Sequence, residues 1–182
     1  MRVKGSVIVT IPEFVKETQG KEGLNLWLKS LDPEIRRIFT SNIRICRWYS
    51  LLTLVQGTHK VCRLFYHGSM DGALELGRYS SKKMLRNPVI KHFMSFGNLR
   101  RNIRKGSVVA SKLYEGFKWE LEDCGDETFI LYFFNIPIEH KILLYRYLGW
   151  CEKGLEMNGT PVNINFVKNN KKGSFAMHIK PV

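Results

Sequence analysis

The chain has 182 residues, of which 44% are hydrophobic, and its formal net charge is +13 at pH 7. This length and apolar content exclude a disordered chain and fit one domain with a buried core, residues 1–182. The longest apolar stretches, residues 51–55 and 129–134, are far shorter than the roughly 20 residues of a membrane-spanning helix. The N-terminus also lacks a signal-peptide pattern, so we expect a cytoplasmic protein.

The first two thirds of the chain predict one strand followed by helices. Apolar and polar residues alternate over residues 3–10, which indicates a strand. Thr10 stands at a capping-box spacing from Glu13, and Gly20 ends the helix that begins there. Apolar spacing and cap residues predict further helices over residues 24–31, from 32, over 50–65 and 73–86, from 87, and over 98–114.

After Gly116 the period of the apolar residues changes to two, which is typical of strands. Strands are predicted over residues 117–122 and 128–134, and a helix beginning at Pro137 leads to strands over residues 162–168 and 174–180. We therefore expect an α+β fold, in which an N-terminal strand and a helical layer precede an antiparallel ββαββ sheet unit. The helical part spans about 11–115 and the sheet part about 116–182, joined by strand 3–10.

Positive charge is concentrated in one quarter of the chain. Residues 78–118 contain eleven basic side chains and one acid, Glu115, which gives ten of the thirteen net charges. The basic residues fall on one face of the helix over residues 73–86 and within about a turn of the next helix. Arginine offers a planar fork that suits phosphate and carboxylate groups. The alternative is an ordinary solvated face without a dedicated ligand.

The candidate ligand-binding residues combine these cations with nearby aromatic side chains that could stack on a ligand or line an apolar pocket. They are Arg78, Lys82, Arg86, Arg100, Arg101, Arg104, Lys105, Trp48, Tyr49 and Phe93.

No pattern in the sequence predicts catalysis or metal binding. The five histidines are far apart, the four cysteines lack a C-x-x-C pair, and no nucleophile, P-loop or dinucleotide motif occurs. The acidic cluster over residues 120–127 fits a solvated hairpin turn, and His92 fits a surface or half-buried side chain. We expect no enzyme, no catalytic residue and no metal ligand.

Several segments together resemble a known family. They are residues 3–7 (V-K-G-S-V), the Trp48-Tyr49 pair before a helix, Leu148-Gly149-Trp150 in a long helix, and the closing hairpin. These resemble an uncharacterised bacterial family, abundant as paralogues in myxobacteria, that is similar to the 4-vinyl reductase domain. That domain in turn resembles haem nitric-oxide-binding domains and a vesicle-tethering subunit with an acyl-chain pocket. The resemblance implies a 4-vinyl-reductase-like fold with a ligand cavity between helices and sheet.

Two departures limit what the resemblance implies about cofactors. The closing hairpin, residues 168–175, has none of the cysteines that bind metal in many 4-vinyl reductase domains. The nearest text to the Tyr-x-Ser-x-Arg motif of haem nitric-oxide-binding domains is residues 79–83 (Y-S-S-K-K), which does not match it. We therefore expect no cofactor, neither haem nor zinc.

The sequence leads to a non-enzymatic small-molecule-binding or sensor domain with a basic site for an anionic or amphipathic ligand. We expect a homodimer that signals through an effector protein. The alternative is a protein that binds nucleic acid or a cyclic dinucleotide through the basic surface of residues 78–118. A third reading is a purely structural interaction protein with no pocket.

Overall fold

The computed structural model describes residues 1–88, 94, 96–167 and 174–182. Its first half contains β1 (Arg2–Lys4), α1 (Gly5–Ile8), α2 (Thr10–Ser30), α3 (Pro33–Thr40), β2 (Trp48–Ser50), α4 (Leu51–Phe65) and α5 (Asp71–Leu85). Its second half contains α7 (Leu99–Leu113), β3 (Tyr114–Glu115), β4 (Lys118–Gly125), β5 (Thr128–Phe134), a 3₁₀ turn η1 (Ile138–His140), α8 (Ile142–Met157), β6 (Val162–Val167) and β7 (Ser174–Pro181). Helices and antiparallel strands together confirm the predicted α+β class.

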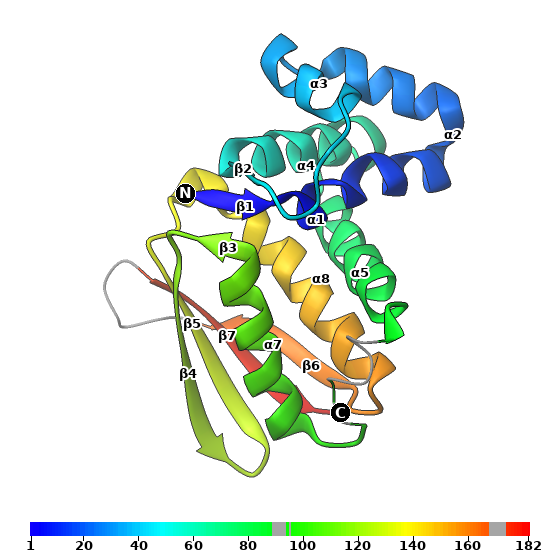
Figure 1. The fold of residues 1–182 in the computed structure, drawn as a ribbon. Helices are drawn as coiled ribbons and strands as arrows, with labels where there is room; N and C mark the ends of the chain where they lie inside the picture. Colours follow the sequence, from blue (N-terminus) through cyan, green and yellow to red (C-terminus); the bar gives the residue numbers. More distant parts are fainter. Residues whose placement is uncertain (89–93, 95, 168–173) are drawn as a thin grey trace.

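The described strands form two antiparallel sheets. The smaller sheet has the order β2-β1-β3, and the larger has the order β4-β5-β7-β6. In Figure 1, α8 runs between the N-terminal helices and the larger sheet, and α7 lies against that sheet. Among the described residues, no helix combines the length and apolar character needed to cross a membrane.

The predicted strand over residues 3–10 is wrong beyond Lys4. The Gly5 amide donates to the Arg47 carbonyl at 2.9 Å and the Ser6 amide to the Ile45 carbonyl at 3.0 Å. These two amides therefore bond to a loop and not to a neighbouring strand. The chain then turns into α1, which buries two adjacent apolar residues of the alternating pattern. Strand β1 pairs with β2 and β3 and therefore does not join the larger sheet.

Most of the other predicted elements are confirmed. The Ser50 hydroxyl accepts from the Leu52 amide at 3.3 Å at the start of α4, and the Asn98 side chain accepts from the Arg101 amide at 2.9 Å at the start of α7. Gly20 has φ +71° and kinks α2, so the predicted helix break lies inside one longer element. The helix predicted from residue 87 falls almost entirely outside the described residues.

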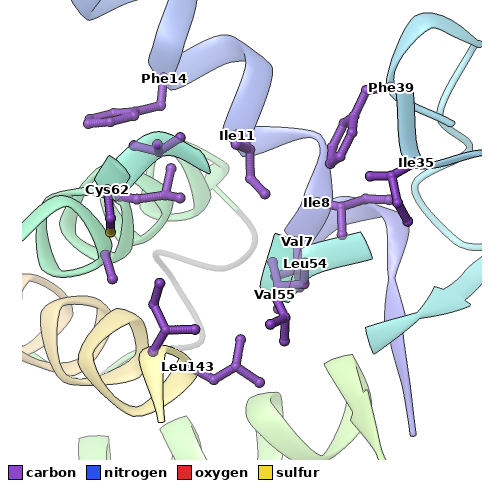
Figure 2. Packing of buried hydrophobic residues seen from close by; sticks show 14 of the residues in the cluster. Val7, Ile8, Ile11, Phe14, Ile35, Phe39, Leu54, Val55, Cys62 and Leu143 are labelled. Carbon is purple, nitrogen blue, oxygen red and sulfur yellow. The ribbon is translucent and has the colours of Figure 1, made fainter. Parts of the chain in front are cut away.

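Two hydrophobic clusters share α8 as a common wall. The first joins α1 to α5 with Leu143 of α8, and Figure 2 shows Leu143 approaching side chains of α4 such as Val55. The second joins α7 and the larger sheet with Leu144, Tyr147 and Leu155 of α8. Because α8 is buried on two sides, a polar residue on it can lie in the seam between the clusters.

Helices α5 and α8 cross at two glycines. A Cβ at Gly77 would lie 2.0 Å from the Arg146 carbonyl oxygen, and one at Gly149 would lie 2.1 Å from the Leu74 carbonyl oxygen. Real Cβ atoms do not approach so closely, so only glycine permits this backbone contact. The crossing brings the C-terminal half of α5 against the middle of α8.

Candidate functional site

A cavity of about 170 Å³ lies at the seam, where α1, α2, α5, α7 and α8 meet. Its apolar walls include Val7, Met84, Val109, Leu113 and Trp150. A second, smaller cavity of about 40 Å³ shares Met84, Tyr147 and Trp150 as lining residues.

The polar wall of the 170 Å³ cavity is built around Arg146, whose exposed fraction is 3%. Its Nη2 lies 2.9 Å from the Val7 carbonyl oxygen, 2.9 Å from Thr10 Oγ1 and 3.1 Å from Ser80 Oγ. Its Nη1 lies 3.4 Å from Thr58 Oγ1. The guanidinium therefore ties α8 to α1, α2, α4 and α5.

The three hydroxyl groups around Arg146 are held as acceptors. Thr10 donates to the Val7 carbonyl at 2.7 Å, Thr58 to the Leu54 carbonyl at 2.7 Å, and Ser80 to the Leu76 carbonyl at 2.8 Å. Each hydroxyl proton is thus engaged, and the oxygen lone pairs face the guanidinium. The expected capping role of Thr10 is wrong, because its hydroxyl serves this buried network and forms no cap at α2.

Burial determines the charge state of the groups near the cavity. Desolvation lowers the pKa of Arg146 to about 10, so the guanidinium is still a cation at pH 7. Desolvation also raises the pKa of Tyr114 and of Tyr147, and it raises the pKa of Cys151, in the smaller cavity, to about 12. These three groups are neutral at pH 7 and supply no negative charge.

The predicted basic residues of α5 lie on the surface, away from this cavity. Arg78 Nη1 lies 2.6 Å from Glu75, and its Nε and Nη2 lie 2.8 Å and 2.6 Å from Glu152. Arg78 and Lys82 line a surface groove of about 430 Å³, the α5 groove, together with Glu75 and Glu152, so its wall carries both signs of charge. Arg86 is exposed at the end of α5.

The predicted basic residues of α7 do come together, in a different place. Arg100, Arg101, Arg104 and Lys105 line a shallow depression of about 400 Å³. Arg100 lies 3.2 Å and Arg104 3.9 Å from Asp123 of β4. Within the described part of the chain, this depression and the α5 groove share no lining residue, so the predicted cations lie on two separate surfaces.

The predicted aromatic residues do not join the basic ones. Trp48 lies in β2, where Lys4 Nζ sits 4.0 Å from its ring centroid. The Tyr49 hydroxyl accepts from the Arg44 amide at 3.0 Å. Neither lines the α5 groove, the α7 depression or the seam cavity, and Phe93 lies outside the described residues.

Sequence reasoning missed Arg146, although a signal was present. The helix beginning at Pro137 has an apolar face that includes Leu143 and Tyr147, and Arg146 follows Leu143 by three residues. A charged side chain at the edge of an apolar helix face either extends its charged end to solvent or is itself buried. Arg146 does not stand out in the charge distribution, because residues 119–182 carry a net charge of only −1.

Solved structures share this fold across almost the whole chain. An Fe(II) unliganded H-NOX protein from K. algicida superposes with a TM-score of 0.73 at 11% identity, covering 98% of this chain and 96% of that one. An H-NOX protein from S. oneidensis in the Fe(II)NO ligation state gives 0.71 at 10% identity, with 98% and 99% covered. A mutant H-NOX protein from T. Tengcongensis gives 0.70 at 13% identity, with 98% and 97% covered.

No protein-family model matches the sequence, and no curated protein matches it. At these low identities the solved structures show the fold alone. The predicted resemblance to haem nitric-oxide-binding domains is confirmed at that level, whereas the relation to the 4-vinyl reductase domain and to myxobacterial paralogues stays a prediction.

The described residues do not fit a haem group. The cavity of about 170 Å³ is smaller than cofactor pockets, which span about 300–1,000 Å³. None of the described histidines lines either cavity, so the described residues provide no histidine ligand for a haem iron. His92 lies outside the described residues. In residues 79–83, Tyr79 donates to Glu17 and Ser80 belongs to the Arg146 network.

Proposed function

We propose that this protein is a non-enzymatic sensor domain that binds a small molecule in the seam cavity between α5, α7 and α8. The observation that carries the proposal is the cavity itself. Protein interiors are close-packed, and voids larger than a water molecule are few. A cavity of about 170 Å³ between the packed elements is larger than an ordinary packing defect.

Occupation of the cavity would stabilise the folded protein. A ligand that binds the folded state and not the unfolded chain shifts the folding equilibrium toward the folded state.

The size of the cavity and the comparisons indicate a compact ligand. An engineered apolar cavity of about 150 Å³ binds benzene or xenon. The S. oneidensis H-NOX structure is described in an Fe(II)NO ligation state, so at least one protein of this fold holds a small molecule. A ligand of this size would contact both hydrophobic clusters at once, since the cavity lies between them.

The nucleic-acid alternative gains no support from the surface geometry. Among the described residues, the α7 depression is lined by Asn98, Val108 and basic side chains, with no aromatic platform for bases. Arg100 and Arg104 also share the carboxylate of Asp123. The homodimer and the effector partner stay predictions.

Benzene and xenon are suitable first probes, with a cavity-filling variant as the control. Ala110 of α7 lines the cavity and is 1% exposed, so Ala110→Leu places three more carbons inside it. Val108 on the same helix is 49% exposed, so Val108→Leu is the matched control. We expect either probe to raise the melting temperature of the wild type and of Val108→Leu, but not that of Ala110→Leu. An equal rise in all three proteins, or in none, would contradict the proposal.

A further inference from the structure

Arg146 is a buried cation without a buried anion. All sixteen Asp and Glu residues of the chain fall within the described ranges, and none of them lines the seam cavity. The four hydrogen bonds of the guanidinium go to three hydroxyl oxygens and one carbonyl oxygen. Among the described residues its Nε has no hydrogen-bond partner, although it belongs to a side chain of the cavity wall.

The surrounding groups cannot neutralise this charge. Tyr114 and Tyr147 line the same cavity, and burial keeps both phenols protonated at pH 7. Removing a cation from water is costly unless an anion or a complete hydrogen-bonding shell replaces the lost hydration. Here the shell is neutral, and the Nε–H group donates to none of the described residues.

A purely structural role explains less of this arrangement. A neutral amide such as Gln could donate to the Val7 carbonyl and to a hydroxyl without the cost of burying a charge. Arginine adds a positive charge and a planar fork that binds carboxylate through two parallel hydrogen bonds. What arginine offers at this position beyond a neutral structural side chain is therefore the ability to bind an anion.

We propose that the ligand of the seam cavity is a small organic anion whose carboxylate pairs with Arg146 and whose compact apolar part occupies the rest of the cavity. This inference rests on the proposed function and deepens it. Val109, Leu113 and Trp150 provide the apolar wall. A volume of about 170 Å³ limits the apolar part to roughly the size of a benzene ring.

Three probes of one shape and different charge test the inference on the wild-type protein. Benzoate is an anion, nitrobenzene is its neutral counterpart, and benzamidine is a cation at pH 7. In calorimetric titrations we expect benzoate to bind at least about tenfold more tightly than nitrobenzene, as charged hydrogen bonds provide. Benzamidine should show no binding, because its charge matches that of Arg146.

Two variants assign the preference to a residue. Arg146→Gln should lose the benzoate preference and retain nitrobenzene binding, whereas the surface variant Arg101→Gln should keep both. Binding through the α7 surface would instead weaken steeply with added salt and respond to Arg101→Gln.

The outcomes separate the two proposals. If nitrobenzene binds as tightly as benzoate, the cavity is a ligand site but the assignment of an anion to Arg146 is overturned. If none of the probes binds, both proposals fail. If Arg146→Gln does not fold, the three titrations of the wild-type protein still decide the question, because they need no variant.

Discussion

Positive charge occurs in two very different settings in this protein. The basic residues of α7 lie on the surface in a shallow depression, where Asp123 pairs with Arg100 and Arg104. Arg146 is one cation buried at the seam of two hydrophobic clusters, with neutral oxygens around it. A surface cation is hydrated and screened by salt, whereas a buried one is neither. The α7 surface therefore carries more positive charge than the seam, but Arg146 is the better candidate for specific ligand binding.

The largest effect is expected where the seam is held together. Gly149→Ala places a Cβ 2.1 Å from the Leu74 carbonyl oxygen and forces α8 away from α5. Overpacking of this kind should lower the free energy of unfolding by about 3 kcal/mol. Urea denaturation measures the change. Gly106→Ala in α7 is the control, because its Cβ would lie 3.8 Å from Trp150 and alanine favours a helix by about 1 kcal/mol. Equal stability of the two variants would show that the crossing is not tightly packed.

A carboxylate introduced beside Arg146 should have the second largest effect. Ser80 Oγ lies 3.1 Å from Nη2, so Ser80→Asp gives the guanidinium an internal anion, and Ser80→Asn is the neutral control. We expect the Asp variant to be more stable than the Asn variant by about 2 kcal/mol at pH 7, as for hydrogen bonds to charged groups. The Asp variant should also no longer bind benzoate. If the Asn variant were the more stable, Arg146 would not lack a counter-charge.

A smaller effect is expected at the edge of the seam. Arg78 pairs with Glu152 of α8 through two nitrogen atoms, and both side chains are about one third exposed. Glu152→Gln should lower the free energy of unfolding by at most about 1 kcal/mol, as for other solvent-accessible ion pairs. The loss should shrink in high salt, since screening already weakens the pair. A salt-independent loss above this value would place Arg78 in the interior.

The smallest effect is expected on α7. Arg101 is exposed in the basic depression, so Arg101→Gln should change the free energy of unfolding by less than about 0.5 kcal/mol. Thermal and urea unfolding both measure this. A larger loss would mean that the α7 surface contributes to the packing of the domain.

Local sequence patterns predicted most of the elements because their causes are local. Ser50 and Asn98 cap the helices that they were expected to cap, and alternating residues formed the β4–β5 hairpin. The strand predicted over residues 3–10 failed because its partners depended on tertiary contacts. The loop before β2 takes the Gly5 and Ser6 amide bonds, and nothing near residue 5 in the sequence encodes that loop.

The candidate site was harder to predict than the fold. Thr10, Thr58, Ser80 and Arg146 are separated by up to 136 residues and meet only after α5 crosses α8 at Gly149. The sequence contains the cation and the glycine, but the crossing that brings them together depends on both hydrophobic clusters. The cluster of cations on α7 could be predicted because these residues are neighbours in the sequence. Closeness in sequence does not show whether a side chain is buried.

The guanidinium of Arg146 can be observed directly by NMR through its Nε–Hε signal. The signal is assigned by its loss in Arg146→Lys, and the wild-type protein is then titrated with benzoate and with nitrobenzene. We expect the Arg146 signal to shift with benzoate as that ligand saturates the protein, while the Arg101 signal stays in place. Benzoate binding that moves the α7 signals and leaves Arg146 unchanged would contradict the assignment of the ligand to the seam cavity.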